Sequence, residues 1–147
     1  MSLNAAASQG DLDTVHQHIK AGSDVNDGSE DGGSPLITAA TFGHTEVARA
    51  LIQADADLNQ RNKEGSTALH VAAFFCRTEI VQLLLENEAD KDARTNAGAT
   101  ALDSVSGPFE EVKEIYEYVE SLLSPVGLKL DYERTKTTRP TIAKMLR

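Results

Sequence analysis

This sequence of 147 residues lacks several features that mark other protein classes. A single cysteine, Cys76, excludes an intramolecular disulfide and a cysteine-based metal cluster. Aromatic residues make up 5% of the chain and tryptophan is missing, so alanine and leucine supply much of its apolar content. That composition favours many short, closely packed helices over a sheet sandwich. No apolar run approaches the roughly 20 residues that a membrane-spanning helix needs.

Positive charge is also scarce, with 14 basic against 23 acidic residues and a net charge of −9. Nucleic acids and anionic membranes attract proteins with a positive surface, so neither is expected as a partner. We interpret the excess negative charge as a contribution to solubility. No leader with a basic start and an apolar stretch is recognisable. The compartment therefore stays open between a cytoplasmic protein and an exported one whose leader has been removed.

What the sequence does contain is a repeat at a fixed offset of 33 residues. Leucine recurs at Leu3, Leu36, Leu69 and Leu102. The same offset relates alanine pairs, acidic positions and glycines: Ala6-Ala7, Ala39-Ala40 and Ala72-Ala73; Asp24, Asp57 and Asp90; Gly32, Gly65 and Gly98. A period of this length is typical of stacked supersecondary units.

Each unit has the signals of two short helices. Ser34 stands at a helix N-cap and Pro35 at the first helical position, where its missing N–H does no harm. Leu36 and the following alanine pair then form a narrow apolar stripe. A second helix is expected over about 46–54. Polar stretches at 26–33, 59–66 and 92–99 should form projecting β-turns, which we call fingers.

Three segments resemble the ankyrin repeat. They are Thr67-Ala68-Leu69-His70-Val71-Ala72-Ala73, Gly43-His44-Thr45-Glu46-Val47 and Ala56-Asp57-Leu58-Asn59. The resemblance implies an all-α solenoid with units at approximately 3–33, 34–66, 67–99 and 100–127. It also implies a structural role for the signature histidines, His44 and His70.

The repeat pattern breaks after Val105. A helix is expected over 109–123, with Ile115, Tyr118, Val119 and Leu122 on its apolar face. The tail, 128–147, is interpreted as two short helices that form a degenerate fifth unit and cap the array. This end of the chain resembles that of small bacterial ankyrin proteins. The whole chain, 1–147, is then a single domain.

Three substitutions depart from the repeat pattern. Asp55 and Glu88 occupy the position of Gly22, where the family needs a left-handed backbone, so both are expected at positive φ. Cys76 replaces the glycine found at Gly10 and Gly43. We interpret Cys76 as a small packed residue; a redox or catalytic thiol is the alternative.

Catalysis is not expected. His16 and His18 point in different directions on a helix, which disfavours a zinc site. Neither a phosphate loop nor a nucleophile elbow is present, so no metal or cofactor is expected.

The predicted function is to bind a partner protein, as a monomer, through a concave groove and the fingers. The alternative is a regulatory or targeting domain of a larger enzyme or of an exported bacterial protein. Residues expected to contact the partner are Thr41, Phe42, Phe74 and Phe75 on the first helices, and Glu30, Asp31, Lys63, Glu64 and Asn96 on the fingers. Phe75 has a second interpretation, in which it packs between units or beneath the C-terminal segment instead.

Overall fold

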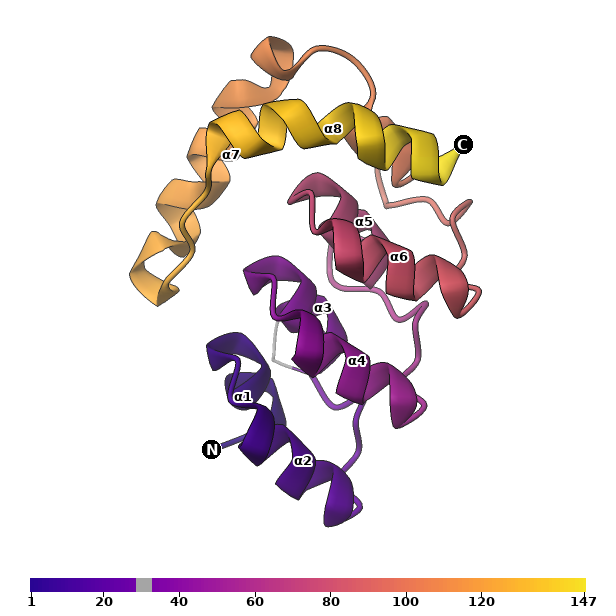
Figure 1. The fold of residues 1–147 in the computed structure, drawn as a ribbon, viewed down its shortest axis with the longest axis vertical. Coiled ribbons are helices and arrows are strands. Elements are labelled where there is room, and N and C mark those ends of the chain that lie inside the picture. Colours follow the sequence, from indigo (N-terminus) through magenta and orange to yellow (C-terminus); the bar gives the residue numbers. More distant parts are fainter. Residues whose placement is uncertain (29–32) are drawn as a thin grey trace.

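Three consecutive pairs of short helices stack upon one another in the computed structural model, which describes residues 1–28 and 33–147 (Figure 1). Two or three residues connect the helices of each pair. The pairs are α1 (Leu3–Gln9) with α2 (Leu12–Lys20), α3 (Pro35–Phe42) with α4 (Thr45–Gln53), and α5 (Ala68–Phe74) with α6 (Thr78–Glu86). The described residues form no β-strand, so the predicted all-α solenoid is confirmed.

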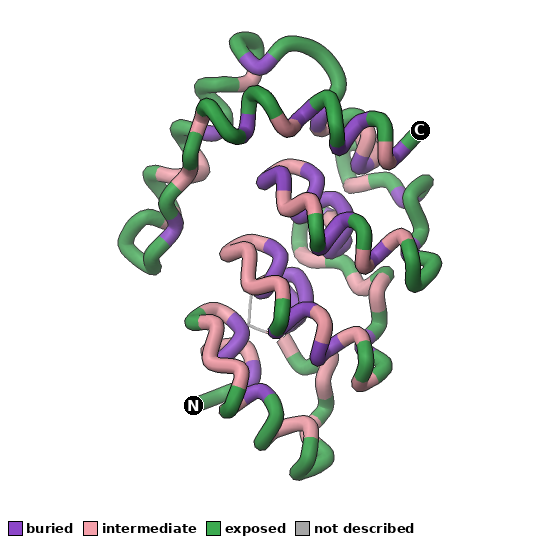
Figure 2. Tube along the Cα trace, viewed as in Figure 1, coloured by how far each residue is buried: buried purple, intermediate pink, exposed green. Residues whose placement is uncertain are grey.

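The pairs build two parallel rows of helices. The first helices, α1, α3 and α5, contact one another in an inner row, and α2, α4 and α6 form an outer row. Leu36 and Leu69 are 1% exposed, and the alanine pairs of all three inner helices are fully buried between neighbours. Figure 2 shows these buried segments where successive pairs face each other. Alanine allows the inner helices to approach closely, and the leucines fill the remaining space.

Side-chain hydrogen bonds repeat with the same period. The Ser34 hydroxyl accepts from the Ile37 N–H (3.1 Å), and Thr67 and His70 form a capping box at the start of α5. Between units, Asn26 Oδ1 accepts from the backbone N–H of Asp57 (2.7 Å). Asn59 accepts from Asp90 in the same way (3.0 Å). Repeated side chains thus make equivalent bonds within units and between them.

The C-terminal part differs from the prediction. A short 3-10 helix, η1 (Leu102–Val105), ends the inner row. It is followed by α7 (Phe109–Leu123), a second 3-10 turn η2 (Ser124–Val126), and α8 (Tyr132–Leu146). Helix α7 has the expected bounds. The tail, however, forms one continuous helix, and α8 contacts α6 and η1 directly instead of stacking as a fifth unit beyond them.

The two short helices expected over 128–147 are therefore one helix, and Pro140 lies inside it. Proline in a helix interior removes a hydrogen bond and costs about 3 kcal/mol. One uninterrupted helix nevertheless places Thr135, Arg139, Ile142 and Leu146 on a single face, and all four are buried. Burial of that face against α6 and η1 outweighs the local cost of the proline.

The predicted orientation of α7 was also wrong. Ile115, Tyr118 and Leu122 were expected to face inward, but they are 51%, 64% and 58% exposed. Tyr116 is fully buried instead, and Phe109 is 8% exposed. The helix carries two apolar stripes, and the one that begins at Phe109 faces the array.

Backbone geometry confirms the prediction for Asp55 and Glu88, which both have a φ of 64°. Cys76 also has a positive φ, 56°. At the equivalent Gly10, a Cβ atom would lie 2.7 Å from His44 of the next unit, so glycine is needed there for space as well. At Cys76 the neighbouring element is α8, and the thiol lies 3.8 Å from the Thr135 carbonyl oxygen.

Candidate binding groove

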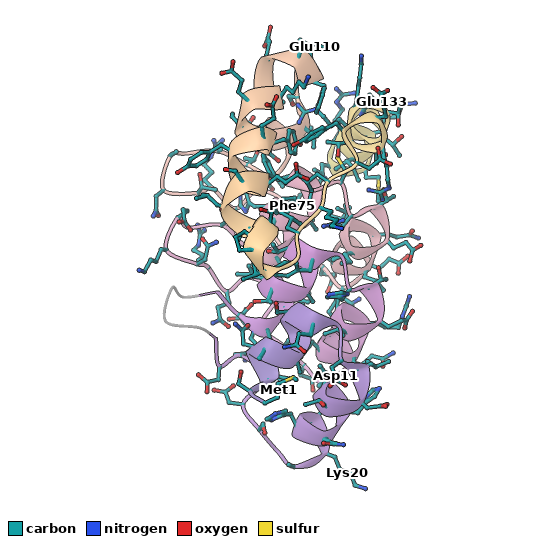
Figure 3. All side chains as sticks on the ribbon, turned by 90° about the vertical axis from the view of Figure 1, so that its left-hand side faces the viewer. Met1, Asp11, Lys20, Phe75, Glu110 and Glu133 are labelled. Carbon is teal, nitrogen blue, oxygen red and sulfur yellow. The ribbon has the colours of Figure 1, made fainter. Side chains whose placement is uncertain are left out.

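A groove runs along the inner row of helices. It consists of two adjoining cavities of about 400 and 420 Å³, which share Ile37, Thr41, Asn62, Glu64 and Leu123 as lining residues. The inner helices α3 and α5 form its floor, the second finger (59–66) forms one side, and α7 forms the other. Figure 3 shows α7 lying across the inner row on this face of the molecule. We call this feature the inner groove.

The half of the groove over α5 is bounded by aromatic rings. Phe74 and Phe75 line it together with Val71 and Val119. Phe74 stacks on Tyr116 of α7 with ring centroids 4.3 Å apart, and the Tyr116 hydroxyl donates to the Phe74 carbonyl oxygen (2.6 Å). This contact holds α7 against α5 and closes the groove at this end.

The half over α1 and α3 is lined by Phe42 and Val126. Phe42, at the end of α3, is half-buried, and its ring lies 6.4 Å from that of His44 in a stacked arrangement. Val126 of η2 lies across the cavity from the inner helices and is 60% exposed.

Charge within the groove is low and negative. Glu64 is the one carboxylate among the described residues that line the two cavities. Both ring nitrogens of His70 already have hydrogen-bond partners. Nδ1 bonds to Thr67, and Nε2 lies 3.0 Å from the Ala99 carbonyl oxygen. The groove thus combines an apolar floor with one exposed carboxylate on the finger side.

A comparison with protein families matches a family of ankyrin repeats, in three copies, to residues 3–95, which is more than half of the chain. The chain belongs to the ankyrin-repeat family. A comparison with curated proteins finds no match. Ankyrin repeats are in general protein–protein interaction modules, and the family is typically non-catalytic.

The ankyrin fold brings several of the predicted contact residues together. Thr41, Phe42 and Glu64 line the inner groove, and Phe74 lines its α5 half while also stacking on Tyr116. Phe75 also lines the α5 half but is 6% exposed, with the Arg77 guanidinium over its ring (5.6 Å), which agrees with its interpretation as a packed residue.

The finger residues lie apart from the groove floor. Lys63 and Asn96 are exposed, and neither is found among the described residues that line the two cavities. The Asn96 side chain donates to the Lys63 carbonyl oxygen (2.7 Å), which ties the second finger to the third. Glu30 and Asp31 lie outside the described residues.

Sequence reasoning missed the contribution of α7 and η2 to the groove. Val119, Leu123 and Val126 line it, although the repeat pattern does not extend to them. The apolar character of Leu123 and Val126 beyond the end of the expected stripe was the available signal. Their position depends on the direction in which α7 leaves η1, which no local pattern encodes.

The signature histidine of the second unit, its counterpart in the third unit and the single cysteine have structural roles in this ankyrin array. His44 Nε2 lies 3.0 Å from the Ser8 carbonyl oxygen, and Arg77, one unit later, donates to the equivalent Thr41 oxygen (2.7 Å). Burial raises the pKa of the Cys76 thiol to about 11, which keeps it protonated near neutral pH.

In the described part of the chain, no three His, Cys, Asp or Glu side chains are grouped as metal ligands. Nor is any helix there both long and apolar enough to cross a bilayer.

Proposed function

We propose that the chain binds a segment of a partner protein in the inner groove, as a monomer and without catalysis of its own. The observation that carries this proposal is the half-buried Phe42 ring in a continuous groove with an apolar floor. Aromatic side chains at such positions are typical binding anchors, because a partner removes them from water at little cost in conformational entropy.

Groove chemistry supports a partner segment with apolar residues and at least one basic residue. The apolar side chains would cover Phe42 and Leu123, and the basic residue would lie near Glu64. Electrostatic complementarity of this kind contributes more to specificity than to affinity. The negative net charge of the chain agrees with a preference for basic segments.

Selection from a random peptide display library, with the purified chain as target, would test the proposal. Enriched peptides would be synthesised and their Kd measured against the wild type, Phe42→Ala and Gln17→Ala. Loss of a binding anchor should weaken binding roughly thirtyfold. Gln17 is exposed on α2 in the outer row, so its variant is the control.

A second variant, Glu64→Lys, tests the electrostatic part. It should weaken binding of basic peptides most strongly at low salt, because exposed charges are screened as ionic strength rises. Peptides that bind all four proteins equally well would show that the inner groove is not the binding site.

A further inference from the structure

The outward side of α7 carries the main concentration of exposed apolar residues in the described structure. Five large hydrophobic side chains are exposed among the described residues. One is Met1, and the other four belong to α7 and η2: Ile115, Tyr118, Leu122 and Val126. Ile115, Tyr118 and Leu122 follow one another at intervals of three and four residues, so they form one stripe. We call this stripe the outer face of α7. It points away from the inner row, because Tyr116 and Phe109 face that side.

Acidic residues border the outer face. Glu111 precedes Ile115 by one helical turn, and Glu110, Glu114 and Glu117 follow one another along the flank. All four are exposed. Among the described residues, one ion pair involves this helix, Glu110 with Lys136 (2.9 Å). The surface is therefore an apolar stripe with a negative margin.

We propose that the outer face of α7 binds a basic amphipathic helix of a partner protein. Such a helix would cover Tyr118 and Leu122 with its apolar side and place Lys or Arg residues beside Glu114 and Glu117. Amphipathic helices bind apolar surfaces through side chains spaced three and four residues apart, which matches this stripe. The inward side of the same helix lines the inner groove, so α7 lies between two binding surfaces.

Charge and chemistry disfavour the other occupants of this surface. An anionic membrane would be repelled by the four glutamates. A second copy could offer the basic residues Lys136 and Lys144 of α8. The exposed positions between them, Thr137, Pro140 and Thr141, provide no large apolar side chain to cover the stripe.

A synthetic amphipathic helix of about 18 residues, built from leucine and lysine at helical spacing, is a suitable probe. The same pattern built from leucine and glutamate is the peptide control. Fluorescence anisotropy of labelled peptide would give the Kd with the full chain. We expect the leucine–lysine peptide to bind and the leucine–glutamate peptide not to bind.

Two pairs of substitutions locate the site. Tyr118→Ser with Leu122→Ser should weaken binding by about tenfold or more at unchanged melting temperature, because both side chains are exposed. Glu114→Lys with Glu117→Lys should weaken it at low salt and reduce its salt dependence. Glu79→Lys with Glu86→Lys on α6 changes the net charge equally and should leave binding unchanged.

Several outcomes would overturn the inference. Equal loss with the α6 pair would indicate non-specific charge attraction. Dimerisation detected by light scattering, and abolished by the Tyr118 and Leu122 substitutions, would identify a second copy as the occupant. Co-sedimentation with anionic vesicles would identify a membrane. If Phe42→Ala removes peptide binding and the α7 variants do not, the peptide occupies the inner groove; the proposed function then stands and this inference fails.

Discussion

Tyr116 and Phe74 join α7 to the inner row through two contacts at once. Their rings stack with centroids 4.3 Å apart, and the Tyr116 hydroxyl donates to the Phe74 carbonyl oxygen at 2.6 Å. The same hydroxyl accepts from Arg139 of α8 (3.0 Å). One side chain of α7 therefore contacts both α5 and α8 and holds α7 beside the inner groove.

Substitution of Tyr116 should separate packing from hydrogen bonding. Tyr116→Phe keeps the stacked ring but removes the hydroxyl, and the unsatisfied partners should cost about 1–3 kcal/mol. Tyr116→Ala should cost about 3–5 kcal/mol because it also leaves a cavity. Tyr118→Phe is the control, since Tyr118 is 64% exposed. Urea unfolding measures all three, and equal stability of Tyr116→Phe and wild type would contradict the role of the hydroxyl.

Alanine substitutions at the two groove phenylalanines should have different effects on stability. Phe42→Ala should lower the free energy of unfolding by about 1–2 kcal/mol, because the ring is half-buried and stacks on His44. Phe74→Ala should be clearly more destabilising, since it removes the stacking contact with Tyr116. Thermal unfolding compares them, and a larger loss for Phe42→Ala would place that ring in the core.

Replacement of Glu88 by glycine should be neutral or stabilising. Glu88 has a φ of 64°, a conformation that costs a non-glycine residue about 1 kcal/mol, whereas glycine adopts it freely. Gln82→Gly, at an exposed position inside α6, is the control and should destabilise by about 1 kcal/mol. A fall in melting temperature for Glu88→Gly comparable to that of the control would show that the glutamate makes stabilising contacts.

Stability should decline at alkaline pH through Cys76. Burial raises its pKa from 9.0 to about 11 in the folded chain, so the unfolded chain loses the thiol proton first. The contribution of Cys76 is complete below pH 9.0 and is lost as pH rises toward about 11. Denaturant unfolding at several pH values measures the slope. Cys76→Ala should reduce it, and the remaining slope includes Tyr116, whose pKa burial raises to about 12. An unchanged slope would exclude the thiol as its source.

Local sequence was sufficient for the repeat region. The caps at Ser34 and Thr67, the buried alanine pairs and the positive φ of Asp55 and Glu88 all follow from residues within one unit. Contacts between units, such as Asn26 with Asp57, recur at the same offset, so one unit predicts the next. In the candidate site, this was enough to locate Thr41, Phe42 and Glu64.

Tertiary contacts decided the C-terminal part. Helix α7 has two apolar stripes of similar quality, and its sequence alone does not state which one packs inward. The choice is made by Phe74 and Arg139, which lie 42 and 23 residues from Tyr116 and hold it in place. Pro140 likewise lies inside a helix because of what its neighbours bury. The 33-residue period thus determined the solenoid by itself, because each unit contacts its neighbours through repeated residues. The position of α7 and the second wall of the groove depended on long-range packing, because no repeated residue specifies them.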